Sequence, residues 1–183
     1  MPPKARITKE QVIDAAVEIV RTKGEDALTA KSLAGALKCS TQPIFWQFKG
    51  MDEVKSKVAE YALQKFDEYL HEKLPSVSAY KSVGLNYIRF AMEETEFFKL
   101  LFMSEKSGKD ILKTHEEMPY VLQVLRDEEK IKGAKAQEIY EEMWLFSHGI
   151  ATMIATKTVE FSADKIQEML TAVYRGLVNN LSD

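Results

Sequence analysis

Apolar residues recur at spacings of three and four along almost the whole of this 183-residue chain. One such stripe, which falls on a single face of a helix, consists of Val12, Ala16, Ile19 and Val20. Sustained alternation of apolar and polar residues, with the β-branched side chains that strands favour, is hard to find. The sequence therefore predicts an all-α fold.

Capping residues and helix breakers divide this pattern into about nine helices. The first is expected over residues 8–23, with Thr8 as its N-cap and Gly24 as its stop. Two short helices follow over residues 29–37 and 40–48. The six remaining predicted helices cover residues 51–73, 78–95, 97–103, 119–130, 135–159 and 162–181. We expect a three-helix head over residues 1–50 and a larger helical body over residues 51–183.

Charge is unevenly distributed along the chain, whose formal net charge is -3. Residues 1–57 carry ten lysines and arginines against seven acidic residues, whereas the remainder carries fifteen against twenty-one. Contact with phosphates requires a locally basic surface and not a basic protein as a whole. The head is therefore suited to binding nucleic acid.

The composition disfavours several other classes of protein. No run approaches the roughly 18 apolar residues of a membrane span, and the first residues lack the apolar stretch of a signal peptide, so we expect a cytoplasmic protein without a membrane partner. Cys39 is the only cysteine, and the three histidines lie far apart without ligand partners at metal spacing. We expect no metal, no cofactor and no enzyme activity, because no paired carboxylates, activated nucleophile or cofactor loop stands out.

The two short helices over residues 29–37 and 40–48 form a helix-turn-helix if the second can enter a major groove of DNA. The apolar residues that can hold this pair together are Leu33, Ala34, Leu37, Ile44 and Phe48. The side chains left on the outer surface are Lys31, Thr41, Gln42, Trp46 and Gln47. Gln can make paired contacts to adenine, and Thr can contact base edges or phosphate.

Three further residues of this segment are expected to contribute to DNA binding. As predicted N-caps, Thr29 and Ser40 would place free backbone N–H groups where a phosphate oxygen can bind. Pro43 falls in the first turn of its helix, where the missing N–H is no loss, and it could pack against a thymine methyl group.

From residue 8 to residue 54 the chain resembles the TetR family of bacterial transcriptional regulators. The resemblance rests on a first helix that ends in Gly24, on Leu33-Ala34, Leu37 and Ser40, and on the aromatic-rich segment Ile44-Phe45-Trp46-Gln47-Phe48-Lys49. It implies an N-terminal DNA-binding head, a helical body that binds a small-molecule effector, and a homodimer.

The chain departs from the usual residues of that family at four positions. Phe45 and Gln47 stand where the family usually has Tyr and His, so a phenolic phosphate contact is lost and a different donor is present. Met51 replaces a Lys, for which Lys49 is a substitute two residues earlier. Lys38 takes a turn position usually filled by Gly, where a left-handed conformation would cost about 1 kcal/mol. We expect the chain to bind DNA in the way the family does but through altered contacts. Phe45 and Lys49 are expected to be among the residues that contact DNA.

Large, adaptable apolar side chains are unusually frequent in the body. Such groups line ligand cavities, although for any single residue core packing is the more frequent role. The candidate ligand-binding residues are Tyr87, Phe90, Phe98, Phe102, Met118, Tyr120, Trp144 and His148. Trp144, His148 and Gly149 also resemble a pattern in the penultimate helix of a subset of the TetR family, and residues 90–105 look like the stretch that precedes it.

The last two predicted helices carry apolar faces. These faces consist of Ile139, Met143, Phe146, Ile150 and Ile154 on one helix and Ile166, Met169, Leu170, Val173, Leu177 and Val178 on the other. As the resemblance implies, they would pack against their two-fold copies in an intermolecular four-helix bundle. Two related heads can contact half-sites about 34 to 36 Å apart, so the operator should be a near-palindrome.

The sequence thus leads to the hypothesis of a TetR-type repressor that a small apolar or amphipathic ligand releases from double-stranded operator DNA. Ligand binding in the body would shift the long helix over residues 51–73 and change the separation of the heads. The alternative is a helical ligand-binding protein or enzyme without a DNA function. Measuring the binding of upstream DNA distinguishes the two.

Overall fold

The computed structural model describes residues 7–103 and 119–180, which contain nine α-helices, a short 3-10 turn and no strand. In chain order the helices are α1 (Lys9–Lys23), α2 (Ala30–Ala36), α3 (Gln42–Gln47), α4 (Met51–His71), α5 (Ala79–Glu93), α6 (Thr95–Phe102), α8 (Pro119–Asp127), α9 (Gly133–Ala155) and α10 (Ala163–Asn180). The prediction of an all-α fold with about nine helices is confirmed. The candidate ligand residue Met118 lies outside the described residues.

The ends of α1 show why the local sequence folds as it does. The Thr8 hydroxyl accepts a hydrogen bond from the backbone N–H of Gln11, and the Gln11 side chain accepts one from the N–H of Thr8 in return. At the other end Gly24 adopts φ +81°, and its N–H donates to the carbonyl of Val20 at 2.8 Å. Both predicted boundary signals of the first helix are confirmed.

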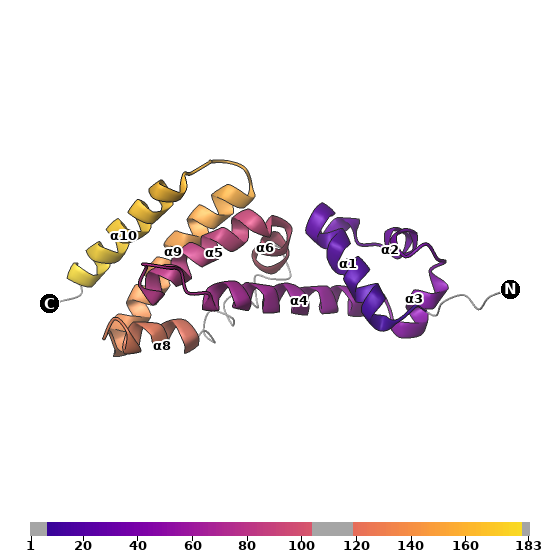
Figure 1. Cartoon of the computed structure of the whole chain (residues 1–183), viewed down its shortest axis with the longest axis horizontal. Helices are drawn as coiled ribbons and strands as arrows, with labels where there is room; N and C mark the ends of the chain where they lie inside the picture. The colour runs from indigo at the N-terminus through magenta and orange to yellow at the C-terminus, as the bar shows by residue number, and fades with distance from the viewer. Residues whose placement is uncertain (1–6, 104–118, 181–183) are drawn as a thin grey trace.

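Helix α4 is the long element that runs from the head to the body (Figure 1). Its buried residues recur every four positions and are Val54, Val58, Ala62, Phe66 and Leu70. Helix α4 packs on α1, α5 and α6, and the ring of Phe66 in its second half contacts Phe90 of α5 and Phe102 of α6. Head and body therefore share one continuous hydrophobic core.

The body is assembled around α5, which contacts α4, α6, α8, α9 and α10. Figure 1 shows α9 and α10 together at the end of the molecule remote from α2 and α3. The buried Asn86 on α5 donates to the backbone carbonyl of Glu72 at 2.6 Å and so fastens the connection between α4 and α5. None of the helices in the described ranges is long and apolar enough to cross a membrane.

Three ion pairs among the described residues join the head to the rest of the chain, and one of them connects Lys9 on α1 with Glu53 on α4 at 3.5 Å. The guanidinium of Arg21 on α1 binds the carboxylate of Glu94, with Nε donating to Oε2 at 2.8 Å, and Glu94 is only 3% exposed at the start of α6. Lys55 on α4 pairs at 3.2 Å with Glu25, which lies in the 3-10 turn after α1. Helix α1, which also contacts α3, is thus linked to the start of α6 through the Arg21–Glu94 pair.

Candidate DNA-binding surface and ligand cavity

The helix-turn-helix is held by a small buried scaffold. Leu33 on α2 and Ile44 on α3 are fully buried, and Phe48, the residue after α3, is 3% exposed. Lys38 adopts φ 52° in the turn, and the N–H of Cys39 donates to the carbonyl of Ala34 at 3.0 Å. The left-handed conformation considered for Lys38 is therefore present, and the turn closes on α2.

The two short helices begin differently. At α2 the Thr29 hydroxyl accepts from the N–H of Ser32 at 3.1 Å, and the Ser32 hydroxyl accepts from the N–H of Thr29 at 3.0 Å, so the predicted Thr29 cap is confirmed. At α3 the predicted Ser40 cap is wrong: Thr41 occupies the N-cap position and makes no side-chain capping bond. Because α3 starts later than expected, Pro43 is its second residue, where a missing N–H costs nothing.

The outer surface of the head carries most of the predicted DNA-contacting side chains. The exposed members are Thr29, Lys31, Ser40, Thr41, Gln42, Phe45, Trp46 and Lys49, with Pro43 half-buried. Trp46 is 70% exposed and Phe45 is 45% exposed. Large aromatic side chains are seldom so open to water, and adjacent exposed aromatic groups indicate a surface that contacts a partner.

Gln47 does not share this position. It is half-buried, and its side-chain Nε2 donates to the backbone carbonyl of Ile7 at 3.1 Å. The expectation that Gln47 lies free on the outer surface is therefore wrong, because the last residue of α3 is turned toward the segment that precedes α1. Its amide N–H₂ links the recognition helix to that segment.

Charges at the edge of α3 are organised by Glu53 on α4. Its carboxylate accepts from the backbone N–H of Lys49 at 2.7 Å and from Lys9 Nζ at 3.5 Å. The Lys49 N–H bond, followed by the Lys9 ammonium, holds the pKa of Glu53 below its ordinary value. Among the residues that the structure describes, no acid forms an ion pair with the side chain of Lys49 or Lys31, so both ammonium groups are available to phosphates.

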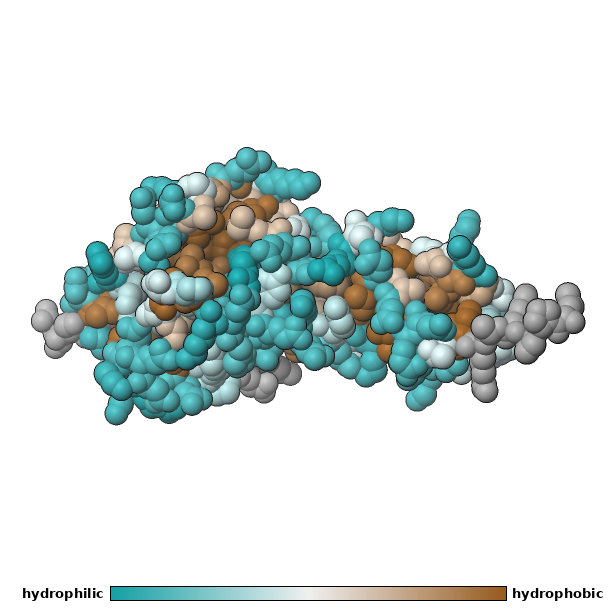
Figure 2. Space-filling model, in the orientation of Figure 1, coloured by the Kyte–Doolittle hydropathy of each residue, from teal (hydrophilic) through white to brown (hydrophobic). Residues whose placement is uncertain are grey.

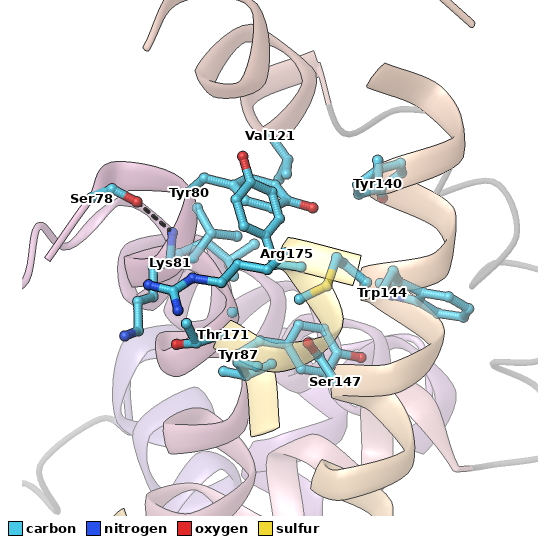
Figure 3. Close-up of a pocket in the computed structure, with 16 residues that line it drawn as sticks. Ser78, Tyr80, Lys81, Tyr87, Val121, Tyr140, Trp144, Ser147, Thr171 and Arg175 are labelled. Atoms are coloured by element: carbon cyan, nitrogen blue, oxygen red, sulfur yellow. Dashed lines mark hydrogen bonds between the residues drawn. The ribbon is translucent and has the colours of Figure 1, made fainter. Parts of the chain in front are cut away.

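A cavity of about 170 Å³ lies in the body, between α5, α9 and α10 and beside the end of α4 (Figure 3). Its lining residues are Leu70, Ser78, Tyr80, Lys81, Val83, Gly84, Tyr87, Val121, Tyr140, Met143, Trp144, Ser147, Leu170, Thr171, Tyr174 and Arg175. Most of the wall is apolar, with hydroxyl groups and two cationic side chains at intervals. Such a site favours an apolar ligand that carries a polar group.

Tyr87 and Trp144 are the two sequence-predicted ligand residues that line this cavity. Another predicted ligand residue, His148, contacts both of them. Its Nδ1 is 2.9 Å from the Tyr87 hydroxyl, and its ring stacks on Trp144 with centroids 5.2 Å apart. Burial lowers the pKa of His148 and raises that of Tyr87, so the imidazole and the phenol are both neutral near pH 7.

The remaining described aromatic candidates do not line the cavity and pack against other aromatic side chains. Phe90 and Phe98 are fully buried, and Phe102 is half-buried. The ring of Phe66 lies 5.2 Å from that of Phe90 and 5.0 Å from that of Phe102, in edge-to-face arrangements. Tyr120 stacks on His71 at 3.8 Å. In this conformation these residues pack the core between α4, α5 and α6 or its edge.

The cavity residues at the start of α5 and along α10 are not among those expected from the sequence. They are Ser78, Tyr80, Lys81, Val83, Gly84, Thr171, Tyr174 and Arg175. The apolar stripe of α10 predicts a dimer interface and gives no indication that polar residues of the same helix line a cavity. The available signal was Tyr174, a phenol within the apolar stripe of that helix, followed directly by the basic residue Arg175.

The faces expected to form a dimer are partly used inside the protomer. The residues that already lie in its core are Ile139, Met143, Ile150, Ile166 and Leu170. The residues that stay half-buried are Phe146, Ile154, Met169, Val173, Leu177 and Val178. Within the described ranges, no three His, Cys, Asp or Glu side chains gather as they would around a metal ion.

Comparison with known proteins gives one curated relative and several solved structures. No family model matches the chain. An uncharacterised HTH-type transcriptional regulator from Bacillus subtilis, YobS, is 17% identical over 172 residues, which cover 92% of this chain and 90% of the relative.

The similar structures have low sequence identity but cover nearly the whole chain. A TetR-like transcriptional regulator from Rhodococcus sp. RHA1 superimposes with a TM-score of 0.68 and 16% identity, covering 97% of this chain and 98% of that one. A protein of unknown function from the same organism has a TM-score of 0.73 and 17% identity over 100% of both chains. A TetR variant from Acinetobacter baumannii AYE in complex with minocycline has a TM-score of 0.58 and 16% identity, covering 95% and 96%. The chain therefore has the fold of the TetR-like transcriptional regulators.

Proposed function

We propose that this chain is a TetR-type transcriptional repressor that binds a near-palindromic operator as a homodimer and is released by a small apolar or amphipathic ligand. The observation that carries the proposal is the exposed side of α3, where Phe45 and Trp46 project from a buried scaffold of Leu33 and Ile44. A helix presented in this way can enter a major groove. The regulator YobS, similar over most of its length, supports the same function.

The contacts to DNA divide into two groups. Gln42, exposed at the first turn of α3, suits paired hydrogen bonds to an adenine, and Trp46 and Phe45 suit apolar contact with thymine methyl groups or sugars. Lys31 and Lys49 suit phosphates on either side of the groove. Gln47 is assigned no base contact, because its side chain is half-buried and is turned toward Ile7, to whose carbonyl Nε2 donates.

The homodimer is assigned to the outer side of α9 and α10. Leu145 is 61% exposed and Met153 is 36% exposed on α9, and apolar surface is visible over this part of the molecule in Figure 2. Pairing with a second copy would remove these side chains from water, together with the half-buried apolar residues of α10. The dimer places two copies of α3 on one face of DNA, as half-site recognition requires.

Release by a ligand is assigned to α4. Leu70, near the end of this helix, lines the cavity, while Glu53 at the beginning of α4 pairs with Lys9 of α1 at 3.5 Å. A ligand that binds more tightly to the arrangement with unsuitable head spacing lowers DNA affinity, and a coupling of about 1 to 3 kcal/mol gives roughly 5- to 150-fold release.

The DNA-binding proposal is tested by fluorescence anisotropy with DNA from upstream of the protein's own gene. We expect tight, salt-dependent binding that the double variant Gln42→Ala, Trp46→Ala loses. The matched control is Gln64→Ala, an exposed glutamine on α4 outside the head, which should bind as the native protein does. Native affinity in the double variant would reject α3 as the contact surface.

The release step has its own test. A compound shown to bind the body is added to the protein–DNA complex, and the operator dissociation constant is measured again. A compound that occupies the cavity and leaves this constant unchanged would count against ligand-relieved repression while leaving DNA binding intact.

A further inference from the structure

The cavity in the body carries its positive charge on one side. Lys81 comes from the first turn of α5 and Arg175 from α10, and both line the cavity. In Figure 3 these two side chains lie on the same side of the cavity as Ser78 and Thr171, whereas Tyr140 and Trp144 lie across from them. The site therefore has a cationic side and an aromatic side.

Among the described residues, no carboxylate forms an ion pair with Lys81 or Arg175, whereas Arg89, further along α5, is paired with Glu72 and Glu93. Burial, and after it the Glu129 carboxylate, raise the pKa of the Tyr174 phenol above its ordinary value, so this group of the cavity wall is neutral at pH 7.

The start of α5 adds to this positive side. Ser78 caps the helix, and its hydroxyl accepts from the N–H of Lys81 at 3.4 Å. The N-terminal end of a helix of this length carries a partial positive charge, which favours a nearby anion. The two cationic side chains and the helix end therefore all contribute positive charge at one side of a mostly apolar cavity.

The size of the cavity limits what can occupy it. An apolar cavity of about 150 Å³ in another protein holds one benzene molecule, which has six carbon atoms. The cavity here is about 170 Å³. It therefore accommodates about six to eight carbon atoms, with a polar group left at the rim.

We propose that the cavity binds a small amphipathic carboxylate, such as a medium-chain acid, with its chain among Leu70, Val83 and Leu170 and its carboxylate at Lys81 and Arg175. This inference rests on the proposed function only in treating the cavity as the ligand site. Arg175 suits a carboxylate because its guanidinium offers paired donors, and Lys81 adds a point charge beside it.

The test compares octanoate with octanamide, which share chain length and differ in charge. Isothermal titration calorimetry on the full-length native protein at pH 7.5 should show octanoate bound at least ten-fold more tightly than octanamide. In the double variant Lys81→Gln, Arg175→Gln the two affinities should come within two-fold of each other, with octanamide binding unchanged. The control Lys157→Gln, Lys165→Gln removes two exposed positive charges that do not line the cavity and should keep the preference.

Three results would overturn the inference: equal affinities in the native protein, a preference that persists in the double variant, or binding of neither compound. Thermal melts of both double variants verify that they fold, which is expected because the substituted side chains lie at the rim. Operator binding by the unliganded protein is measured in parallel. DNA binding without an octanoate preference rejects the carboxylate and leaves the proposed regulator standing, whereas the reverse result rejects the regulator alone.

Discussion

Replacing Arg21 with Met should destabilise the protein more than replacing its partner Glu94 with Gln. The side chain of Glu94 is 2% exposed, whereas that of Arg21 is 47% exposed. Loss of Arg21 leaves a buried carboxylate without its cation, and loss of the Glu94 charge leaves a guanidinium that water can solvate. Replacing one member of this ion pair should therefore lower the free energy of unfolding more than replacing the other.

The magnitudes follow from this difference in burial. Breaking a fully buried pair costs about 3 to 5 kcal/mol, and the half-exposed side of this pair admits water, so we expect about 2 kcal/mol for Arg21→Met. Gln keeps the shape of Glu and can still accept a hydrogen bond, so Glu94→Gln should cost about 1 kcal/mol. In the double variant the buried charge is gone, and the protein should be more stable than Arg21→Met alone.

Urea unfolding followed by circular dichroism measures these differences as shifts in the midpoint at constant slope. The control is Arg126→Met, whose partner Asp127 is exposed and whose loss should cost under about 0.5 kcal/mol. Greater loss for Glu94→Gln than for Arg21→Met, or a double variant less stable than Arg21→Met, would refute the argument from burial.

Four further predictions concern single residues. Lys38→Gly should stabilise by about 0.5 to 1 kcal/mol in urea, because Gly adopts the observed φ of 52° without strain. Gly24→Ala should destabilise by about 1 kcal/mol or more, because φ is +81° and the new Cβ would lie 2.9 Å from Glu96 Oε2. Ile44→Ala should cost about 2 to 4 kcal/mol and weaken DNA binding in anisotropy, because the side chain is fully buried under α3. Burial lowers the pKa of His148, so at this residue the unfolded chain binds more protons than the folded one, and stability falls as the pH drops below the ordinary pKa of 6.5. The difference between the urea midpoints at pH 7.5 and pH 5.5 should therefore be smaller in His148→Gln than in the native protein. An unchanged difference would contradict this.

The fold was predictable because its signals are local. Thr8, Gly24 and Thr29 mark helix ends through bonds to residues three or four positions away, and the structure contains each of those bonds. The prediction of Ser40 as the N-cap of the third helix was wrong for a reason that is also local. Both Ser40 and Thr41 are plausible N-caps, and Thr41 takes that position in the structure.

The sites were less predictable because they depend on contacts between distant residues. The local sequence leaves Gln47 available for DNA, but the carbonyl of Ile7, forty residues earlier, accepts a hydrogen bond from its side chain. Phe90 and Phe98 are large aromatic residues of the body, as Tyr87 is, yet packing between α4, α5 and α6 buries them completely. Arg175 becomes a cavity residue only because α10 lies against α5. Periodicity in one helix does not contain this information.

The length of α4 has a geometric consequence. With 21 residues the helix is about 31 Å long at roughly 1.5 Å per residue. A tilt of about 10° at its body end would therefore displace its head end by about 5 Å, more than the roughly 3.4 Å between successive base pairs. In a symmetric dimer the two displacements combine, so a rearrangement of a few degrees around the cavity is enough to take both copies of α3 out of register with the grooves.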